Sequence, residues 1–160
     1  MNTRPAAALP RLRHLCAADL DRMVEIEQAA YPFPWTRGIF ADCLRAGYDA
    51  RGLEIGEWLA GYFVQMRVAG ESHLLNLCIA PQCQGRGYGR VLLDHAIEIA
   101  DSAGCFGLFL EVRPSNKAAI ALYRKRGFYR IGDRPQYYRA ARGRENALVM
   151  RLDLPADGRA

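Results

Sequence analysis

The chain has 160 residues, of which 51% are hydrophobic and 24% are charged, and its formal net charge is +5. This length and balance fit one soluble globular domain with its own core, and they exclude a disordered or fibrous chain. No apolar run approaches the roughly 18 residues of a membrane span, and residues 1–10 lack the apolar core of a signal peptide. We expect a single cytoplasmic domain over residues 1–160, with its core at about 11–154 and no membrane partner.

The cysteines and the spread of charge exclude two further classes. The five cysteines form no C-x-x-C pair and no cluster with histidines of the kind that binds zinc. We expect reduced thiols that pack as small hydrophobic groups, with a catalytic cysteine as the alternative, and no metal site. The positive charge is modest and scattered, which favours an anionic ligand over a direct nucleic-acid partner. The cysteines are Cys16, Cys43, Cys78, Cys83 and Cys105.

Alternating strand-like and helix-like periods predict a mixed α/β or α+β domain. In the first half we expect a strand, two helices and then three antiparallel strands. The segment "YPFPWT" ends the first helix with two prolines and supplies Thr36 as the N-cap of the second. Hairpin turns are expected at Gly56-Glu57 and at Gly70-Glu71-Ser72. The expected elements are Arg11–Leu15, Asp19–Ala30, Thr36–Leu44 and the strands within Arg51–Ile79.

The second half continues with a helix, an apolar strand, another helix and a final strand pair. A glycine near each helix end, Gly104 and Gly127, is typical of a helix C-terminus. Between the last two strands we expect a long loop that holds Tyr137, Tyr138 and four arginines. The expected elements are Arg90–Ser102, Cys105–Val112, a helix that starts at Ser115 or Asn116, Phe128–Ile131 and Asn146–Leu154.

The segment "QGRGYGR" places three glycines directly before a helix. Glycine allows unusual dihedrals and close approach, and the first N–H groups of a helix have no internal partner. The segment is therefore a candidate anion cradle. The G-x-G-x-x-G and Walker A patterns both fail here, which leaves Gln-x-x-Gly-x-Gly at Gln84, Gly87 and Gly89.

Glu111 and Tyr123 are the candidate catalytic side chains. A carboxylate near the end of a buried strand is costly unless it is paired or used, so Glu111 is either functional or in a salt bridge with Arg113 or another arginine. Tyr123 lies seven residues after Asn116, so the two are expected on nearly the same helix face. Core packing is the alternative for Tyr123.

The chain resembles the GCN5-related N-acetyltransferases in two ways. It has their glycine pattern, and its elements follow their order of strand, loop, helix, strand ending in Glu and helix starting with Asn. The chain is most similar to the ribosomal-protein-alanine N-acetyltransferases of the RimI type, through "IEQAAYPFPWT", "NLCIAPQCQGRGYGRVLL", "LEVRPSNKAAIALYRKRGF" and "YYRAARGRENALVM". The resemblance covers about residues 11–152 and implies a central mixed, mostly antiparallel sheet, splayed in the middle and flanked by about four helices. It implies transfer of acetyl from acetyl-CoA to the N-terminal alanine of a small-subunit ribosomal protein.

The resemblance also assigns roles to residues. Glu111 would be the general base and Tyr123 the general acid. Trp35, Tyr137 and Tyr138 would flank the groove for the peptide N-terminus, with ordinary loop packing as the alternative for Trp35. Asn146 stands where the RimI type usually has Asp. The acetyl-CoA residues would be Leu77, Cys78, Ile79, Gly85, Arg86, Gly87, Tyr88, Gly89, Arg90 and Asn116.

The chemistry of the acceptor is consistent with these roles. An α-amine has a pKa of about 7.7–8.0, against about 10.4 for lysine, so modest help from a base is enough near neutral pH. A phenol such as Tyr123 stays protonated there and could protonate the leaving thiolate. Two other functions remain open: an acetyltransferase on this fold that acts on a small amine or other peptide N-termini, and a non-catalytic acyl-CoA sensor.

Overall fold

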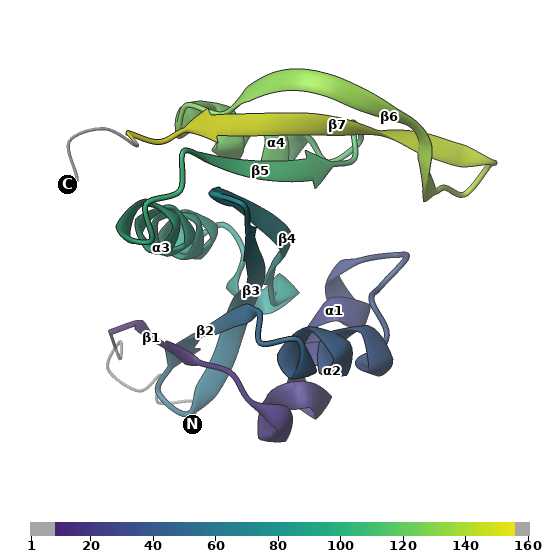
Figure 1. Ribbon diagram of the computed structural model, residues 1–160. Helices are drawn as coiled ribbons and strands as arrows, with labels where there is room; N and C mark the ends of the chain where they lie inside the picture. Colours follow the sequence, from purple (N-terminus) through teal and green to yellow (C-terminus); the bar gives the residue numbers. More distant parts are fainter. Residues whose placement is uncertain (1–8, 156–160) are drawn as a thin grey trace. The chain divides into compact units, whose positions relative to one another are not determined.

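The computed structural model describes residues 9–155 (Figure 1). The chain divides into two compact units, Met1–Val64 with Asn76–Leu92, and Gln65–Leu75 with Leu93–Ala160. The expectation of a single domain over residues 1–160 stays a prediction. No helix within residues 9–155 is long and apolar enough to cross a membrane.

Seven strands and four α-helices form within the described part of the chain, and hydrogen bonds order the strands as β1-β2-β3-β4-β5-β7-β6. The pairs β1 with β2, β5 with β7, and β6 with β7 are antiparallel, whereas β4 and β5 are parallel. The predicted mixed, mostly antiparallel sheet is thus confirmed. The strands are β1 (Arg11–His14), β2 (Asp49–Ile55), β3 (Trp58–Val68), β4 (Glu71–Ile79), β5 (Gly107–Val112), β6 (Tyr129–Arg139) and β7 (Arg144–Asp153). The helices are α1 (Leu20–Ala30), α2 (Arg37–Arg45), α3 (Tyr88–Ser102) and α4 (Lys117–Lys125), with 3-10 turns η1 (Ala17–Asp19) and η2 (Pro81–Cys83).

The first unit packs α1 and α2 side by side over apolar residues of β2, β3 and β4 (Figure 1). Thr36 caps α2 as predicted, because its hydroxyl accepts the backbone N–H of Ile39 at 3.3 Å. Burial of the apolar stripes supplies the main stabilisation of this unit. Its core is Leu15, Leu20, Met23, Ile26, Phe40, Cys43, Ala50, Leu59, Tyr62, Val64, Cys78 and Ala80.

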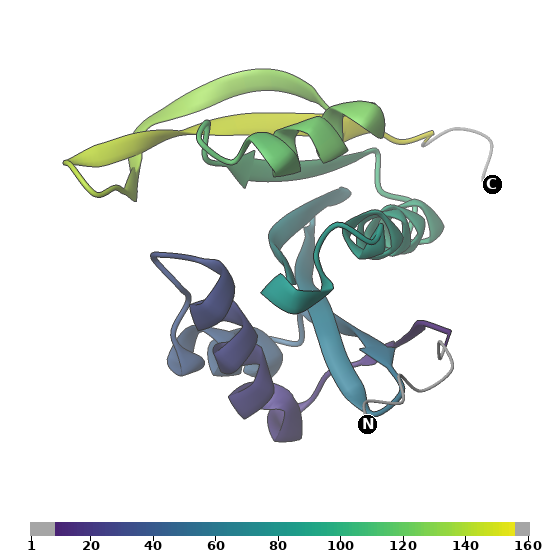
Figure 2. The ribbon, with the colours of Figure 1, turned by 180° about the vertical axis from the view of Figure 1, so that it is seen from behind.

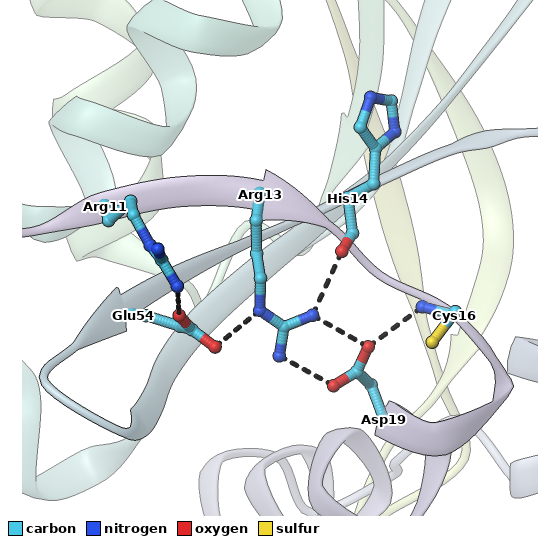
Figure 3. A network of polar contacts seen from close by, with 6 residues as sticks. All are labelled: Arg11, Arg13, His14, Cys16, Asp19 and Glu54. Atoms are coloured by element: carbon cyan, nitrogen blue, oxygen red, sulfur yellow. Dashed lines mark hydrogen bonds and ion pairs between the residues drawn. The ribbon is translucent and has the colours of Figure 1, made fainter.

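A charged network joins β1 to the rest of this unit (Figure 3). Arg13 forms a two-pronged ion pair with Asp19, at 2.7 and 2.9 Å, and a further ion pair with Glu54 on β2. Arg11 reaches the second oxygen of Glu54 at 2.8 Å, and Asp19 accepts the backbone N–H of Cys16 at 2.9 Å. The network therefore fixes β1 both to β2 and to the turn that leads into α1.

In the second unit, α4 covers one face of the sheet formed by β5, β7 and β6 (Figure 2). Successive residues of β5 point alternately to the two faces of this sheet, and Leu108, Leu110 and Val112 are buried. Asn116 caps α4 by accepting the N–H of Ala119 at 3.2 Å, and Gly127 follows the helix with φ at +96°. Buried residues of these strands, of α4 and of the segment after it include Leu108, Leu110, Val112, Ile120, Tyr123, Phe128, Ala147 and Met150.

Two predicted connections are wrong. The hairpin between β3 and β4 turns at Ala69 and Gly70, both at positive φ, so that Glu71 and Ser72 already belong to β4. Ser72 is buried there and accepts a hydrogen bond from the side-chain amide of Gln65 at 2.6 Å. A buried serine on a strand looks like a turn residue in the sequence because its partner is remote along the chain.

The second error is the long loop expected before the last strand. Tyr137 and Tyr138 lie in β6, which runs to Arg139, and only residues 140–143 connect it to β7. Pro135 disfavours a strand in the sequence, but β6 is an edge strand and its ladder with β7 is irregular between Arg134 and Tyr138. This bulge accommodates the proline, so the tyrosines have a fixed place in a sheet.

Candidate active site

The glycine loop of the first unit has the backbone of an anion cradle. Gly85 and Gly87 have φ values of +77° and +84°, which side chains disfavour, and a Cβ at either position would meet no atom within 4 Å. The glycines are therefore required for the path of the backbone, and the space beside them is open. The carbonyl of Gly87 accepts the N–H of Val91 at 3.2 Å, so the helix begins two residues before the predicted start at Arg90.

The other residues predicted for this loop follow from that start. Tyr88, Gly89 and Arg90 form the first turn of α3, where backbone N–H groups lack partners within the helix. Arg86 and Arg90 are exposed on the loop and the first turn. Gln84, the first residue of the pattern, donates its side-chain amide to the carbonyl of Ile79 at 3.0 Å. The loop is thereby tied to the end of β4.

The strand segment Leu77–Ile79 is held by side chains of its own unit. The hydroxyl of Tyr31 donates to the carbonyl of Leu77 at 2.6 Å, while the carbonyl of Ile79 accepts from Gln84. Each carbonyl keeps a second lone pair, so these bonds leave room for another donor. The backbone also lies close to Gly61 on β3, where a Cβ would come within 2.7 Å of the carbonyl of Cys78.

Cys78 is a structural residue of this strand. Its thiol is buried, and burial, followed by the negative charge of Glu27, raises its pKa to about 12. A thiol with that pKa is almost wholly protonated at neutral pH and is a poor nucleophile. Burial also raises the pKa of Cys43. The expectation that these two cysteines pack as small hydrophobic groups is confirmed.

In the second unit, Glu111 lies on β5 among aromatic and cationic side chains. Its carboxylate pairs with Arg134 of β6, Nε to Oε1 at 3.0 Å, so the predicted alternative of a salt bridge holds with this arginine. Arg113 instead pairs with Glu145 at 3.4 Å. Arg134 is largely exposed, so its ion pair with Glu111 has the weak, solvent-screened character of a surface contact.

Tyr137 and Tyr138 are the two phenols that this carboxylate affects. Burial and then the charge of Glu111 raise the pKa of both phenols, which places both hydroxyls within its electrostatic reach. Arg134 lies 5.3 Å from the ring centroid of Tyr137, and Arg113 lies 4.4 Å from that of Tyr138. The sequence identified the two tyrosines and named Arg113 as a possible partner of Glu111, but it did not predict that Arg134 and Arg113 lie against the two rings.

Tyr123 is buried on α4, with its ring centroid 5.6 Å from that of Phe128. Burial raises its pKa to about 12. Tyr123 is also one of the smaller causes, after burial and Glu111, that raise the pKa of Tyr138. The phenol of Tyr123 is thus protonated throughout the physiological range, which a proton donor requires.

Asn116 and Trp35 have structural contacts. Asn116 uses its side-chain oxygen to cap α4, and its amide N–H groups take no part in that bond. Trp35, in the first unit, packs on the core with its ring 5.3 Å from that of Phe40, so the packing alternative holds for it. Its role toward a substrate stays a prediction, as do the roles of the other site residues. Residues 9–155 contain no group of three or more His, Cys, Asp or Glu side chains arranged to hold a metal ion.

The order of these elements has a counterpart in known proteins, since the acetyltransferase (GNAT) family matches residues 20–128. The chain belongs to this family. The [ribosomal protein bS18]-alanine N-acetyltransferase of Salmonella typhimurium is 38% identical over 140 residues, which are 88% of this chain and 95% of that relative. The enzyme of the same name from Escherichia coli strain K12 is 38% identical over 136 residues, 85% of this chain and 92% of its own.

Solved structures agree with this GNAT assignment. The crystal structure of the ribosomal-protein-S18-alanine N-acetyltransferase from Escherichia coli superposes with a TM-score of 0.88 at 36% identity, covering 94% of this chain and 97% of that one. Ard1 from Thermoplasma volcanium shares the fold, with a TM-score of 0.82 at 21% identity over 91% of this chain and 97% of its own. The protein is thus an N-acetyltransferase that uses acetyl-CoA, and the predicted GNAT fold is confirmed.

Proposed function

We propose that this GNAT chain transfers acetyl from acetyl-CoA to the α-amine of the N-terminal alanine of ribosomal protein bS18, in the cytoplasm. The observation that carries the proposal is the near full-length match to enzymes of that name, 38% identical over 88% of this chain and 95% of the relative. The solved relative of similar name at TM-score 0.88 supports it. The acceptor would be an amine that is partly neutral at pH 7, which suits a site with a single candidate base.

The donor would be held by the first unit. The loop Gly85–Arg90 offers positive-φ glycines and the first turn of α3 to the pyrophosphate of acetyl-CoA, because free N–H groups and the helix dipole favour an anion. The exposed Arg86 and Arg90 add positive charge to the same loop. Leu77–Ile79 would bind the amides of the pantetheine arm, as a strand binds an added strand. Asn116 is a further residue predicted to bind acetyl-CoA.

The reaction would be a direct attack in a ternary complex. The amine nitrogen forms a bond to the thioester carbonyl carbon while Glu111 takes the ammonium proton, directly or through one water. The carbon–sulfur bond would then break and the coenzyme A thiolate would receive its proton from Tyr123; Tyr123 would regain a proton from solvent and Glu111 would release its proton there. The thiol of Cys78, buried and with a raised pKa, is poorly suited to form an acetyl-cysteine intermediate, which would require a reactive thiolate.

Mass spectrometry tests the proposal directly. The protein would be incubated with acetyl-CoA and three acceptors: a peptide with the N-terminal sequence of bS18, the same peptide with its α-amine blocked and a lysine retained, and a set of polyamines and amino sugars. One acetyl group on the alanine α-amine alone is expected. Turnover on small amines without modification of the peptide would favour the small-amine alternative. Tight binding of acetyl-CoA without transfer to any amine would favour a sensor.

A further inference from the structure

Glu27 is a buried carboxylate that the proposed chemistry does not use. It lies on α1 with 2% of its surface exposed, and its partners are three neutral donors. The hydroxyl of Tyr62 donates to Oε2, the side-chain amide of Asn76 donates to both oxygens at 3.0 and 3.2 Å, and the backbone N–H of Trp35 donates to Oε1 at 3.2 Å. Burial raises its pKa, against the opposing effect of these bonds. A site this costly suggests a purpose beyond stability.

The three donors come from segments that the proposed function uses. Trp35 belongs to the loop between α1 and α2, which is the predicted entrance for the acceptor. Asn76 stands directly before Leu77–Ile79, the predicted strand for acetyl-CoA. Tyr62, on β3, donates to the same carboxylate and is itself fully buried. One carboxylate therefore connects the acceptor loop to the donor strand within a single compact unit.

A second contact, one helical turn after Glu27, reaches the same strand. Tyr31, four residues after Glu27, donates its hydroxyl to the carbonyl of Leu77 at 2.6 Å. The hydroxyls of Tyr31 and Tyr62 both influence the thiol of Cys78, the next residue of the strand. Three successive residues, 76–78, are thus contacted by the side chains of Glu27 on α1, Tyr31 directly after α1 and Tyr62 on β3. Such a set of contacts fixes both the height and the rotation of the strand relative to the helix.

We propose that Glu27 is a positioning residue, which holds the Trp35 loop and the Asn76–Cys78 strand in the relative placement that the transfer of acetyl between donor and acceptor requires. This inference rests on the proposed function, since it gives a role to the same two segments. Glu27 touches neither substrate. It acts through Asn76 on the donor strand and through the N–H of Trp35 on the acceptor loop.

The decisive variant is Glu27→Gln, which preserves shape but replaces one acceptor oxygen with an NH₂ donor. The backbone N–H of Trp35 can only donate, and Tyr62 or Asn76 would have to turn to accept from the new NH₂ group, so the variant breaks or rearranges the bonds that Glu27 now receives. We expect the dissociation constant for acetyl-CoA, measured by calorimetry, to rise about tenfold. We also expect the KM for the bS18 peptide to rise, because the loop loses its anchor.

Asn76→Ala tests the donor strand separately from the acceptor loop, and it remains informative if Glu27→Gln does not fold. It cuts the link to the donor strand and leaves the bond to Trp35, so it should weaken acetyl-CoA binding and change the KM for the peptide much less. Met23→Ala is the matched control, since Met23 is buried on the same helix and packs only in the core. It should lower the melting temperature while both binding constants stay near those of the wild type.

Three results would overturn the positioning role. They are wild-type acetyl-CoA affinity in folded Glu27→Gln, wild-type affinity in Asn76→Ala, and equal losses of affinity in Met23→Ala and Glu27→Gln at temperatures where both are folded. The calorimetric measurement needs no acceptor. Failure of the proposed acceptor would therefore appear as absent turnover with the affinity pattern intact, and the two failures can be told apart.

Discussion

Asn146 of β7 accepts the backbone N–H of Gln136 of β6 through its side-chain oxygen, at 2.8 Å. The ladder pairs Arg134 with Ala147 and Tyr138 with Glu145, so this one residue faces the three residues of the bulge. Gln136 has φ at +51°, a strained value for a residue with a side chain. Its N–H would otherwise lack a partner in the ladder, so Asn146 stabilises the bulge that contains Tyr137.

Asn146→Ala should therefore loosen the bulge. We expect a loss of about 0.5–1.5 kcal/mol in the free energy of unfolding, the usual value of one hydrogen bond, and a several-fold fall in kcat/KM for the peptide. Asn146→Asp keeps an acceptor oxygen and should retain both properties. Urea unfolding and steady-state kinetics measure the two effects. If Asn146→Asp lost as much stability and activity as Asn146→Ala, this role for the oxygen would be contradicted.

Glu111→Gln tests the general base. Transfer to the peptide should fall about 10²–10⁴-fold at pH 7, where the α-amine is mostly protonated and needs a base. The loss should shrink by pH 9, because the amine is then neutral without help. The measurement is kcat/KM for the bS18 peptide between pH 6.5 and pH 9.5. Glu145→Gln, which removes a carboxylate that binds Ser115 and pairs with Arg113, is the control and should show no such pH dependence.

Tyr123→Phe tests the general acid. It should lower kcat while the dissociation constant for acetyl-CoA stays nearly unchanged, since only a proton donor is lost. Because burial raises the pKa of Tyr123 to about 12, the wild-type kcat should show no alkaline loss from this group up to pH 10. An ordinary phenol, with a pKa of about 10, would be half ionised there. A parallel fall in acetyl-CoA affinity would assign Tyr123 to packing, as its contact with Phe128 also allows.

The sequence predicted the local features of the fold well because they depend on neighbouring residues. Thr36 and Asn116 are N-caps whose partners lie three residues away, and the glycines before α3 have the backbone that their pattern indicates. The placement of Glu111 on a strand among apolar residues also follows from the continuous apolar run around it. These signals need no knowledge of the rest of the chain.

The features that the sequence did not predict depend on contacts between distant residues. The strand β6 contains Pro135 and a positive-φ residue, and only its partner Asn146 and its position at the sheet edge make it a strand. Glu27 looked like one position of an amphipathic helix, whereas Asn76 is 49 residues away. A hydrogen-bond partner at that separation leaves no periodic signal, so the buried carboxylate became visible only in three dimensions.

Gly61→Ala tests the close approach of β3 to the donor strand. The added Cβ would lie 2.6 Å from Cδ1 of Ile79 and 2.7 Å from the carbonyl of Cys78, so the backbone of β4 must move. We expect a loss of about 1–3 kcal/mol in the free energy of unfolding, with weaker binding of acetyl-CoA. Gly38→Ala is the control, since its nearest neighbour is 3.7 Å away and alanine favours helix α2. Unchanged acetyl-CoA affinity in Gly61→Ala would argue against Leu77–Ile79 as its binding strand.

Arg13→Met should destabilise the protein by about 1–2 kcal/mol at pH 7, because it removes charge-assisted bonds to Asp19 and Glu54 and keeps most of the apolar stem. Hydrogen bonds from Arg13 lower the pKa of Asp19, and those from Arg11 and then Arg13 lower that of Glu54. A lowered carboxyl pKa contributes stability above the ordinary value of about 4, and that stability is lost as the pH falls through the folded value. The difference between wild type and variant, measured by urea unfolding, should therefore be full at pH 7 and shrink as the pH falls below 4. An equal difference at pH 7 and in strong acid would mean that Arg13 acts through packing alone.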